Sequence, residues 1–132
     1  MHNLKGQIDY WRKSAEDNWD AANVLFKSKH YDFCLFTCHL AIEKLLKGLV
    51  VIETKEYAPR IHDLERLAVL AKLSLEEGRN MNLKIITRFC MACRYPDEKF
   101  TFYKKCTKDY TEKYLKICEE LFLWLKMQYP KK

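Results

Sequence analysis

Residues 31–53 read YDFCLFTCHLAIEKLLKGLVVIE, and this stretch decides the fold. Its apolar residues recur at intervals of three and four, which is the period of an α-helix. They form two stripes: Cys34, Cys38, Ala41, Leu45, Gly48 and Ile52 make the first, and Leu35, Ile42, Leu46 and Leu49 make the second. A helix with two apolar sides is buried on both of them. We therefore expect residues 31–53 to form a helix at the centre of a bundle, with its second side in a subunit interface.

The same period continues on both sides of this helix. The predicted helices cover residues 4–27, 31–53, 62–76, 82–93 and 107–127. Residues 54–62 are expected to form a loop, and Gly78-Arg79-Asn80 is expected to stop the third helix. Pro96 is expected to end the fourth helix, because a residue before proline is pushed out of helical geometry. Residues 97–106 are expected to form a loop with one short helical turn. No alternating strand pattern is present, so the predicted fold class is all-α: an antiparallel four-helix bundle with an additional short helix.

Length and composition describe one globular domain that spans residues 1–132. Hydrophobic residues make up 48% of the chain and charged residues 32%, a balance that excludes a disordered protein. The net charge of +6 favours partners that carry phosphate or many negative charges. No stretch of about 18 apolar residues is present and the start does not resemble a signal peptide, so we expect a cytoplasmic protein with no membrane contact.

The six cysteines are expected to be thiols that pack as small apolar groups, as in other cytosolic proteins. They stand at positions 34, 38, 90, 93, 106 and 118. Cys90 and Cys93 have the spacing of a zinc-ligand pair, and Cys34, Cys38 and His39 offer further ligands. A structural zinc site usually takes paired ligands from turns, whereas Cys90 and Cys93 continue the apolar face of a predicted helix. We therefore predict no metal and no other cofactor.

Two short polar segments between the helical patterns contain groups that bind phosphates and nucleotides. The first is Pro59-Arg60-Ile61-His62-Asp63-Leu64, and the second is Arg94-Tyr95-Pro96-Asp97. His62 and Asp63 stand at a predicted helix start, where they either cap the helix or help its backbone amides to hold an anion. Arg94 either complements the dipole of the helix before it or binds phosphate, with Asp97 to orient it and Tyr95 to stack on a base.

Two further features have both a structural and a functional interpretation. Glu43 and Lys47 are four residues apart, so they either form an ion pair on the helix surface or place a lysine at the edge of a pocket. The second feature is a group of aromatic residues, which would stack on nucleic-acid bases in the functional interpretation, although their helical spacing favours positions in the core. These residues are Phe100, Phe102, Tyr103, Tyr110 and Tyr114.

In their order and spacing, three stretches resemble the HEPN family, a helical-bundle domain of prokaryotes and some eukaryotic proteins. Residues 15–26 with His30-Tyr31-Asp32 resemble its opening hairpin, CHLAIEKLLKGL at 38–49 resembles its A-x-E-K-x-L-K-A-L helix, and the two polar segments follow. The resemblance covers residues 5–127 and leaves a short basic C-terminal tail. It implies an up-down-up-down bundle with a fifth helix, a homodimer and a cytoplasmic location. The ligand pocket that it implies contains Glu43, Lys47, His62, Asp63, Arg94, Tyr95 and Asp97.

The resemblance also implies what the protein does. Many family members are encoded beside a minimal nucleotidyltransferase and act in toxin–antitoxin pairs, and others are ribonucleases that carry Arg, four to six residues and then His. No arginine of this chain is followed by a histidine at that spacing, so the acid/base and the cation of that RNA-cleaving site are absent.

We therefore predict a non-catalytic module that binds a nucleotide or another phosphate-bearing ligand, with RNA as a further candidate. It would be one component of a nucleotidyltransferase–HEPN pair. Lys47 and Arg94 would contact phosphate, Tyr95 the base or sugar, and Asp63 and Asp97 would orient the cations. One alternative is an interaction partner of the nucleotidyltransferase with no ligand of its own. The other is a ribonuclease with a non-standard site centred on His62.

Overall fold

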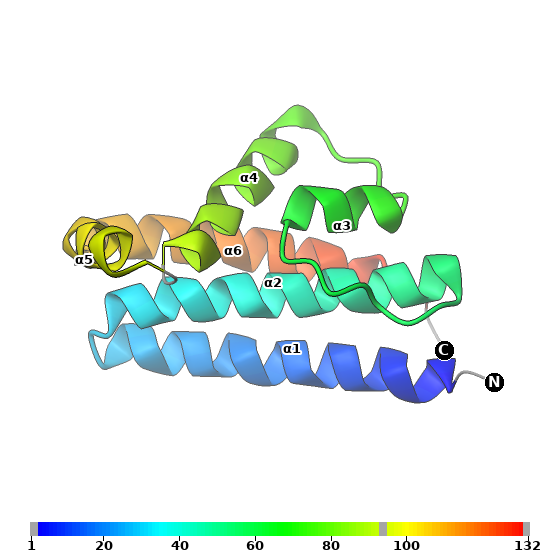
Figure 1. The fold of residues 1–132 in the computed structure, drawn as a ribbon. Helices are drawn as coiled ribbons and strands as arrows, with labels where there is room; N and C mark the ends of the chain where they lie inside the picture. The colour runs from blue at the N-terminus through cyan, green and yellow to red at the C-terminus, as the bar shows by residue number, and fades with distance from the viewer. Residues whose placement is uncertain (1–2, 93–94, 131–132) are drawn as a thin grey trace.

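The computed structural model describes residues 3–92 and 95–130, and within them every regular element is a helix. The helices are α1 (Leu4–Lys27), α2 (Tyr31–Thr54), α3 (Leu64–Leu70), α4 (Glu77–Met91), α5 (Pro96–Lys105) and α6 (Lys108–Met127). Helices α1, α2, α4 and α6 alternate in direction, as in an up-down-up-down bundle, so the all-α prediction is confirmed (Figure 1). The sequence predicted one additional short helix, whereas the described residues contain two, α3 and α5.

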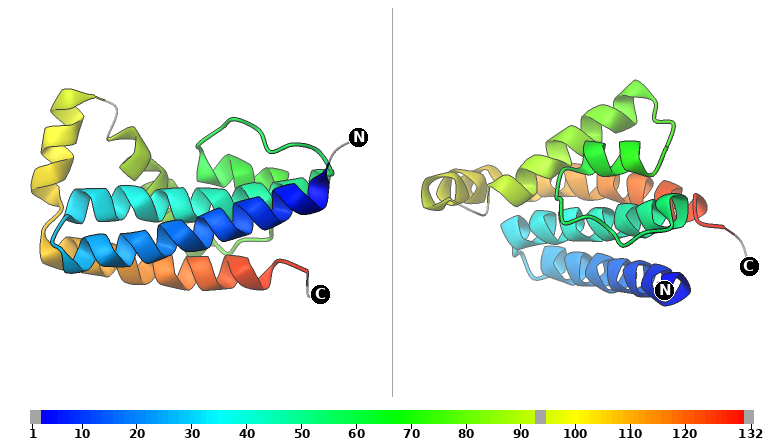
Figure 2. Two further views of the ribbon diagram at one scale, coloured as in Figure 1. Left: turned by 90° about the horizontal axis from the view of Figure 1, so that it is seen from below. Right: turned by 45° about the vertical axis from the view of Figure 1, so that its right-hand side comes forward.

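The hairpin of α1 and α2 begins and ends almost where the apolar period predicts. The side chain of Asn3 caps α1 by accepting the backbone N–H of Gly6 at 3.1 Å. Lys29 takes a left-handed φ of 65° in the turn between the two helices, and Lys55 takes a φ of 57° directly after α2. The two helices lie side by side along their length, and α6 packs against α2 as well (Figures 1 and 2).

Helix α2 is enclosed by other helices of the same chain. Helices α1 and α6 pack against it, and α3 and α4 cover it from another side (Figure 1). Every member of the two apolar stripes is buried except Ile52, which is half-buried. Both stripes are therefore covered without a second subunit, contrary to the expectation that one of them lies in a subunit interface. None of the described helices, α2 included, is long and apolar enough to cross a membrane.

The third and fourth helices differ from the predicted ranges. Helix α3 ends at Leu70, six residues before the predicted end, and Lys72 follows with a left-handed φ of 55°. Helix α4 begins at Glu77, so Gly78-Arg79-Asn80 opens this helix and does not form a stop. The reason is a tertiary contact: Arg79 donates to Glu120 of α6 and its guanidinium lies 4.4 Å from the ring centre of Trp124. Such contacts override local propensity.

Residues 96–105 form α5, where the sequence predicted mostly loop. Helix α4 ends at Met91, so Pro96 does not end it. Pro96 occupies the first turn of α5, where a proline fits because its missing N–H has no partner in the helix. Acidic Asp97 and Glu98 stand in the first turn and basic Lys104 and Lys105 in the last, which complements the helix dipole. The helix is therefore stabilised by its ends, which an apolar period does not reveal.

Candidate functional site

Glu43 is the centre of a buried polar cluster on α2. Its Oε2 forms an ion pair with Lys47 Nζ at 3.0 Å, and its Oε1 accepts a hydrogen bond from His62 Nδ1 at 3.1 Å. Glu43 and Lys47 are only 5% and 7% exposed, and the Lys47 ammonium lies 5.5 Å from the ring centre of Trp11 on α1. The Glu43–Lys47 ion pair predicted from the four-residue spacing is present, but it is buried rather than on the surface.

His39 completes this cluster from one turn earlier in α2. Its Nε2 lies 3.2 Å from the backbone carbonyl oxygen of His62, and because a carbonyl only accepts, Nε2 carries the hydrogen. Nδ1 then lies 3.6 Å from Glu43 Oε1 and has no hydrogen-bond partner. Burial lowers the pKa of His39, although the nearby Glu43 carboxylate acts in the opposite direction. His39 is thus a further member of the site, and its four-residue spacing from Glu43 was the available sequence signal.

The geometry of this cluster restricts its chemistry. Lys47 is buried and already bonded to Glu43, so a direct contact from Lys47 to phosphate does not fit its position. The side chain of His62 is 51% exposed and donates to Glu43 through Nδ1, so Nε2 takes no part in that bond. Of the seven predicted site residues, the cluster brings together three: Glu43, Lys47 and His62.

The start of α3 is capped rather than open. Asp63 accepts the backbone N–H of Arg66 at 3.3 Å, and the backbone N–H of Leu64 donates to the Thr87 hydroxyl of α4 at 3.1 Å. An incoming anion would have to compete with both bonds. Asp63 is therefore the cap of α3, as the capping interpretation predicts.

The second polar segment lies in a different part of the molecule. Arg94 is outside the described residues. Tyr95 is 57% exposed directly before α5, and Asp97 is exposed in the first turn of that helix. Within residues 3–92 and 95–130, neither side chain forms a hydrogen bond or ion pair with Glu43, Lys47 or His62. Asp97 instead borders a groove.

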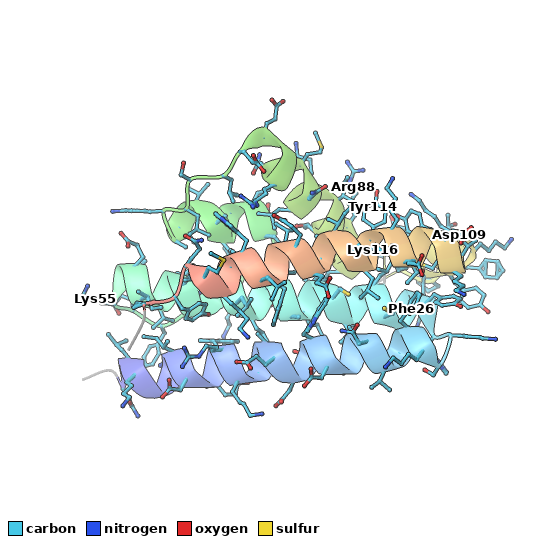
Figure 3. All side chains as sticks on the ribbon, turned by 180° about the vertical axis from the view of Figure 1, so that it is seen from behind. Phe26, Lys55, Arg88, Asp109, Tyr114 and Lys116 are labelled. Atoms are coloured by element: carbon cyan, nitrogen blue, oxygen red, sulfur yellow. The ribbon has the colours of Figure 1, made fainter. Side chains whose placement is uncertain are left out.

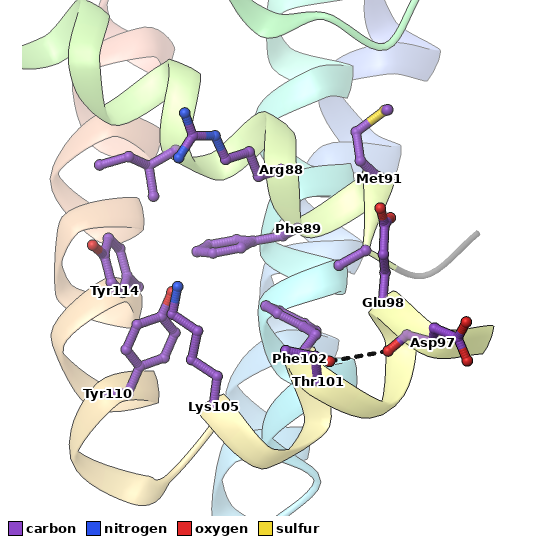
Figure 4. Close-up of a pocket in the computed structure, with 12 residues that line it drawn as sticks. Arg88, Phe89, Met91, Asp97, Glu98, Thr101, Phe102, Lys105, Tyr110 and Tyr114 are labelled. Atoms are coloured by element: carbon purple, nitrogen blue, oxygen red, sulfur yellow. Dashed lines mark hydrogen bonds between the residues drawn. The ribbon is translucent and has the colours of Figure 1, made fainter. Parts of the chain in front are cut away.

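This groove lies between α4, α5 and α6 and has a volume of about 860 Å³. Its walls are aromatic: Phe89 lies 5.5 Å from both Phe102 and Tyr114 between ring centres, and Tyr110 lies 4.8 Å from Tyr114. Figure 4 shows these rings facing the hollow. Their helical spacing favoured core positions for Tyr110 and Tyr114, but both are half-buried and line the groove.

Arg88 and Lys105 bring positive charge to one side of the groove. Both are exposed, and neither forms an ion pair within the part of the chain that the structure describes. Figure 4 shows Lys105 beside Tyr110 and the guanidinium of Arg88 on the same side, whereas Asp97 and Glu98 lie on the opposite side. Seen from behind, Arg88 lies next to Tyr114 of α6 (Figure 3). Sequence patterns do not reveal these two cations, because three separate helices supply the groove.

The hydroxyl of Tyr110 stays protonated at neutral pH. Burial, and secondly the neighbouring Tyr114, raise the pKa of Tyr110 to about 12. The Lys105 ammonium lies 5.4 Å from the centre of the Tyr110 ring. The groove thus combines a phenol donor, two cations and flat aromatic surfaces, groups that can bind an anion and stack on a flat ring.

The cysteines do not form a metal centre in the described residues. Cys34, Cys38 and Cys118 are fully buried. A hydrogen bond with Cys38 and burial raise the pKa of Cys34, and a hydrogen bond with Cys118 and burial raise the pKa of Cys38, although its bond with Cys34 acts in the opposite direction. No group of three metal-ligating side chains occurs among the residues that the structure describes. Cys90 is buried, and Cys93, its partner in the considered zinc pair, lies outside those residues.

Comparison with known families and structures identifies the fold. The HEPN domain matches residues 8–128. The chain belongs to the HEPN family. A crystal structure of TT1696 from Thermus thermophilus is similar, with a TM-score of 0.77 and 20% identity over 93% of this chain and 98% of that one. Another, of the archaeal HEPN homologue ST0689, has a TM-score of 0.70 and 18% identity over 92% of this chain and 96% of that one. No curated protein matches the sequence significantly.

Proposed function

We propose that this HEPN protein is a non-catalytic module that binds a nucleotide or another phosphate-bearing ligand in the groove between α4, α5 and α6. One observation carries the proposal: Arg88 and Lys105, two cations without a described ion pair, stand beside the aromatic walls of a groove of about 860 Å³. A base or ribose would pack against Tyr110 and Tyr114, and Arg88 would bind phosphate with its planar fork.

The residues predicted from the sequence have two roles in this proposal. Asp97 borders the groove and Tyr95 directly precedes α5, so both remain candidates for ligand contact. Arg94, which lies outside the described residues, remains a candidate from the sequence alone. Glu43, Lys47, His62 and Asp63 would act as support. They fix the segment before α3. The backbone N–H of Leu64, the first residue of α3, donates to the hydroxyl of Thr87, and Thr87 is next to Arg88 in the sequence.

The absence of the Arg, four to six residues, His pattern supports a binding role without RNA cleavage. We further propose that the protein acts in the cytoplasm as a homodimer, as one half of a toxin–antitoxin-like pair with a minimal nucleotidyltransferase. The support for this pairing is the family resemblance. Because the stripes of α2 are covered within the chain, both the homodimer and the partner would use a different surface.

Calorimetric titration with a panel of mononucleotides tests the groove. We expect saturable binding by the wild type, at least tenfold weaker binding by Arg88→Ala and by Lys105→Gln, and unchanged binding by Arg66→Ala, an exposed arginine outside the groove. Equal affinities of wild type and Arg88→Ala would contradict the proposal. If no nucleotide binds, while the protein co-purifies with an adjacent nucleotidyltransferase, the alternative of a partner without a ligand is favoured.

One observation favours the ribonuclease alternative enough to test it. His62 is oriented through Nδ1 by the Glu43 carboxylate, the arrangement that positions a histidine as an acid or base. RNA incubated with the wild type and with His62→Gln is therefore compared by gel electrophoresis. Cleavage that disappears in His62→Gln would establish an enzyme, and intact RNA with both proteins agrees with the binding module.

A further inference from the structure

The outer face of α5 exposes two aromatic side chains. Phe100 is 56% exposed and Tyr103 is 64% exposed. The two stand three residues apart, so they lie on one face of the helix. Phe102 is buried on the inner side, and Thr101 and Lys105 line the groove. The aromatic pair is therefore outside the groove and forms a separate surface.

Lysines flank the aromatic pair. Residues 99–108 contain Lys99, Lys104, Lys105 and Lys108 and no acidic residue, while the exposed Asp97 and Glu98 precede them in the first turn of α5 and border the groove. The Lys104 ammonium lies 4.4 Å from the centre of the Phe100 ring, and Lys99 stands on the other side of the aromatic pair along the helix. Helix α5 crosses one end of the bundle, where the turn between α1 and α2 also lies (Figure 2). That turn adds the exposed Lys27 and Lys29.

We propose that the outer face of α5 is a docking surface for single-stranded nucleic acid. Bases would stack on Phe100 and Tyr103, and Lys99 and Lys104 would pair with the phosphates between them. Exposed rings bind bases of any identity because every base has a flat π-face, and lysines beside the rings follow the backbone. The proposal is independent of the nucleotide groove, because no residue of the aromatic pair lines it.

Charge distinguishes this occupant from a second copy of the chain. In a symmetric dimer through α5, Lys99 and Lys104 of one copy would face the same lysines of the other, and the like charges would repel. A nucleic-acid strand neutralises them. Duplex DNA also fits poorly, because its bases are stacked on one another and are not free to cover the rings.

Fluorescence anisotropy with fluorescein-labelled dT12 and rU12 tests the proposal on the full chain. We expect saturable binding that weakens as salt is raised, and weaker binding of a duplex of equal length. Phe100→Leu and Tyr103→Ala should each weaken binding by roughly 5- to 150-fold, as expected for the loss of one stacked base. Tyr103→Phe keeps the ring and should bind like the wild type.

Tyr10→Ala is the matched control, since Tyr10 is an exposed aromatic residue of α1 with 58% exposure. The proposal is overturned if neither oligonucleotide binds, or if Phe100→Leu and Tyr103→Ala bind as well as Tyr10→Ala. Equal binding of the duplex also overturns it. The oligomeric state of the wild type and of Tyr103→Ala is measured by sedimentation velocity. Self-association that is lost in Tyr103→Ala would assign the face to a second copy and overturn the proposal. Phe100→Leu and Tyr103→Ala should leave mononucleotide binding by the groove in place, because neither residue lines it, so failure here and failure of the groove are told apart.

Discussion

The Nε2 atom of His39 lies 3.2 Å from the backbone carbonyl oxygen of His62, so a fully buried side chain of α2 holds the segment that leads into α3. His62 makes a second contact with α2, because its Nδ1 donates to Glu43 Oε1 at 3.1 Å. Backbone and side chain of one residue are thus both bonded to the central helix. The segment before α3 is fixed at this point although it has no regular structure.

Removing the Glu43 charge should destabilise the protein strongly. Glu43→Gln keeps the shape of the side chain but leaves the buried Lys47 ammonium without its counter-ion. Breaking a buried ion pair on one side typically costs about 3–5 kcal/mol. We expect a loss of that order in the free energy of unfolding, measured by urea denaturation. Lys116→Ala, which removes one partner of an exposed pair on α6, should change it by less than about 0.5 kcal/mol.

The stability of the protein should fall in mildly acidic solution through His39. Burial holds the pKa of His39 below its ordinary value of 6.5. As the pH falls through about 6.5, the unfolded chain therefore takes up a proton that the folded chain does not. The contribution of neutral His39 to the free energy of unfolding is thus present above pH 6.5 and is lost progressively below it. His39→Gln keeps a donor for the His62 carbonyl and does not titrate. Urea denaturation between pH 5 and 7.5 should give a smaller pH dependence for His39→Gln; an equal dependence would contradict the assignment.

Gly48→Ala should destabilise the wild type, and it should cost less in a variant with a smaller residue at 129. A Cβ at Gly48 would collide with the Tyr129 side chain and would lie 3.2 Å from Trp11 Cβ. Tyr129 cannot move freely, because its buried hydroxyl donates to the Leu45 carbonyl at 2.7 Å. Overpacking costs about 1–3 kcal/mol, which exceeds the gain of about 1 kcal/mol from alanine in a helix. In Tyr129→Leu this clash is removed and only the close approach to Trp11 Cβ remains, so the loss of stability caused by Gly48→Ala should be smaller. Thermal denaturation of the four proteins measures the difference.

The thiols of Cys34 and Cys38 should resist alkylation in the folded protein. Both are fully buried, and hydrogen bonds and burial hold the pKa of each thiol above its ordinary value, so little thiolate is present. Iodoacetamide at pH 8, followed by peptide mapping, should leave these two residues unmodified. The same treatment in 8 M urea is the control and should modify both. Rapid labelling of Cys38 without denaturant would show that α2 is less enclosed than its contacts indicate.

The long helices were predictable because each has one strong apolar period and a local start signal. Helix α6 is an example: Thr107 caps it by accepting the backbone N–H of Tyr110 at 3.2 Å, one residue from the predicted start. The predicted start of α4 was too late because Gly78 suggested a stop, whereas a contact across to α6 through Arg79 helps to stabilise the first turn of this helix. Helix α5 was not predicted because two of its three aromatic residues, Phe100 and Tyr103, face solvent and interrupt the apolar period.

The candidate site was predictable only where its residues are close in sequence. The Glu43–Lys47 pair follows from a spacing of four, and it is present. The bond from His62 to Glu43 joins residues 19 apart across an irregular segment, whose path no local pattern specifies. The groove is harder still, because Arg88, Lys105 and Tyr110 come from three helices and none belongs to a recognisable motif.

The enclosure of α2 has a consequence for how the molecule opens. Backbone amides in the buried middle of α2 reach water only when α1, α3, α4 and α6 all separate from it. Their hydrogen-exchange rates should therefore report the global free energy of unfolding. Helix α5 has few contacts with α2 and exposes most of its surface, so it can open by itself. The face that we propose for nucleic acid thus belongs to the part of the bundle that can rearrange around a partner without unfolding the rest.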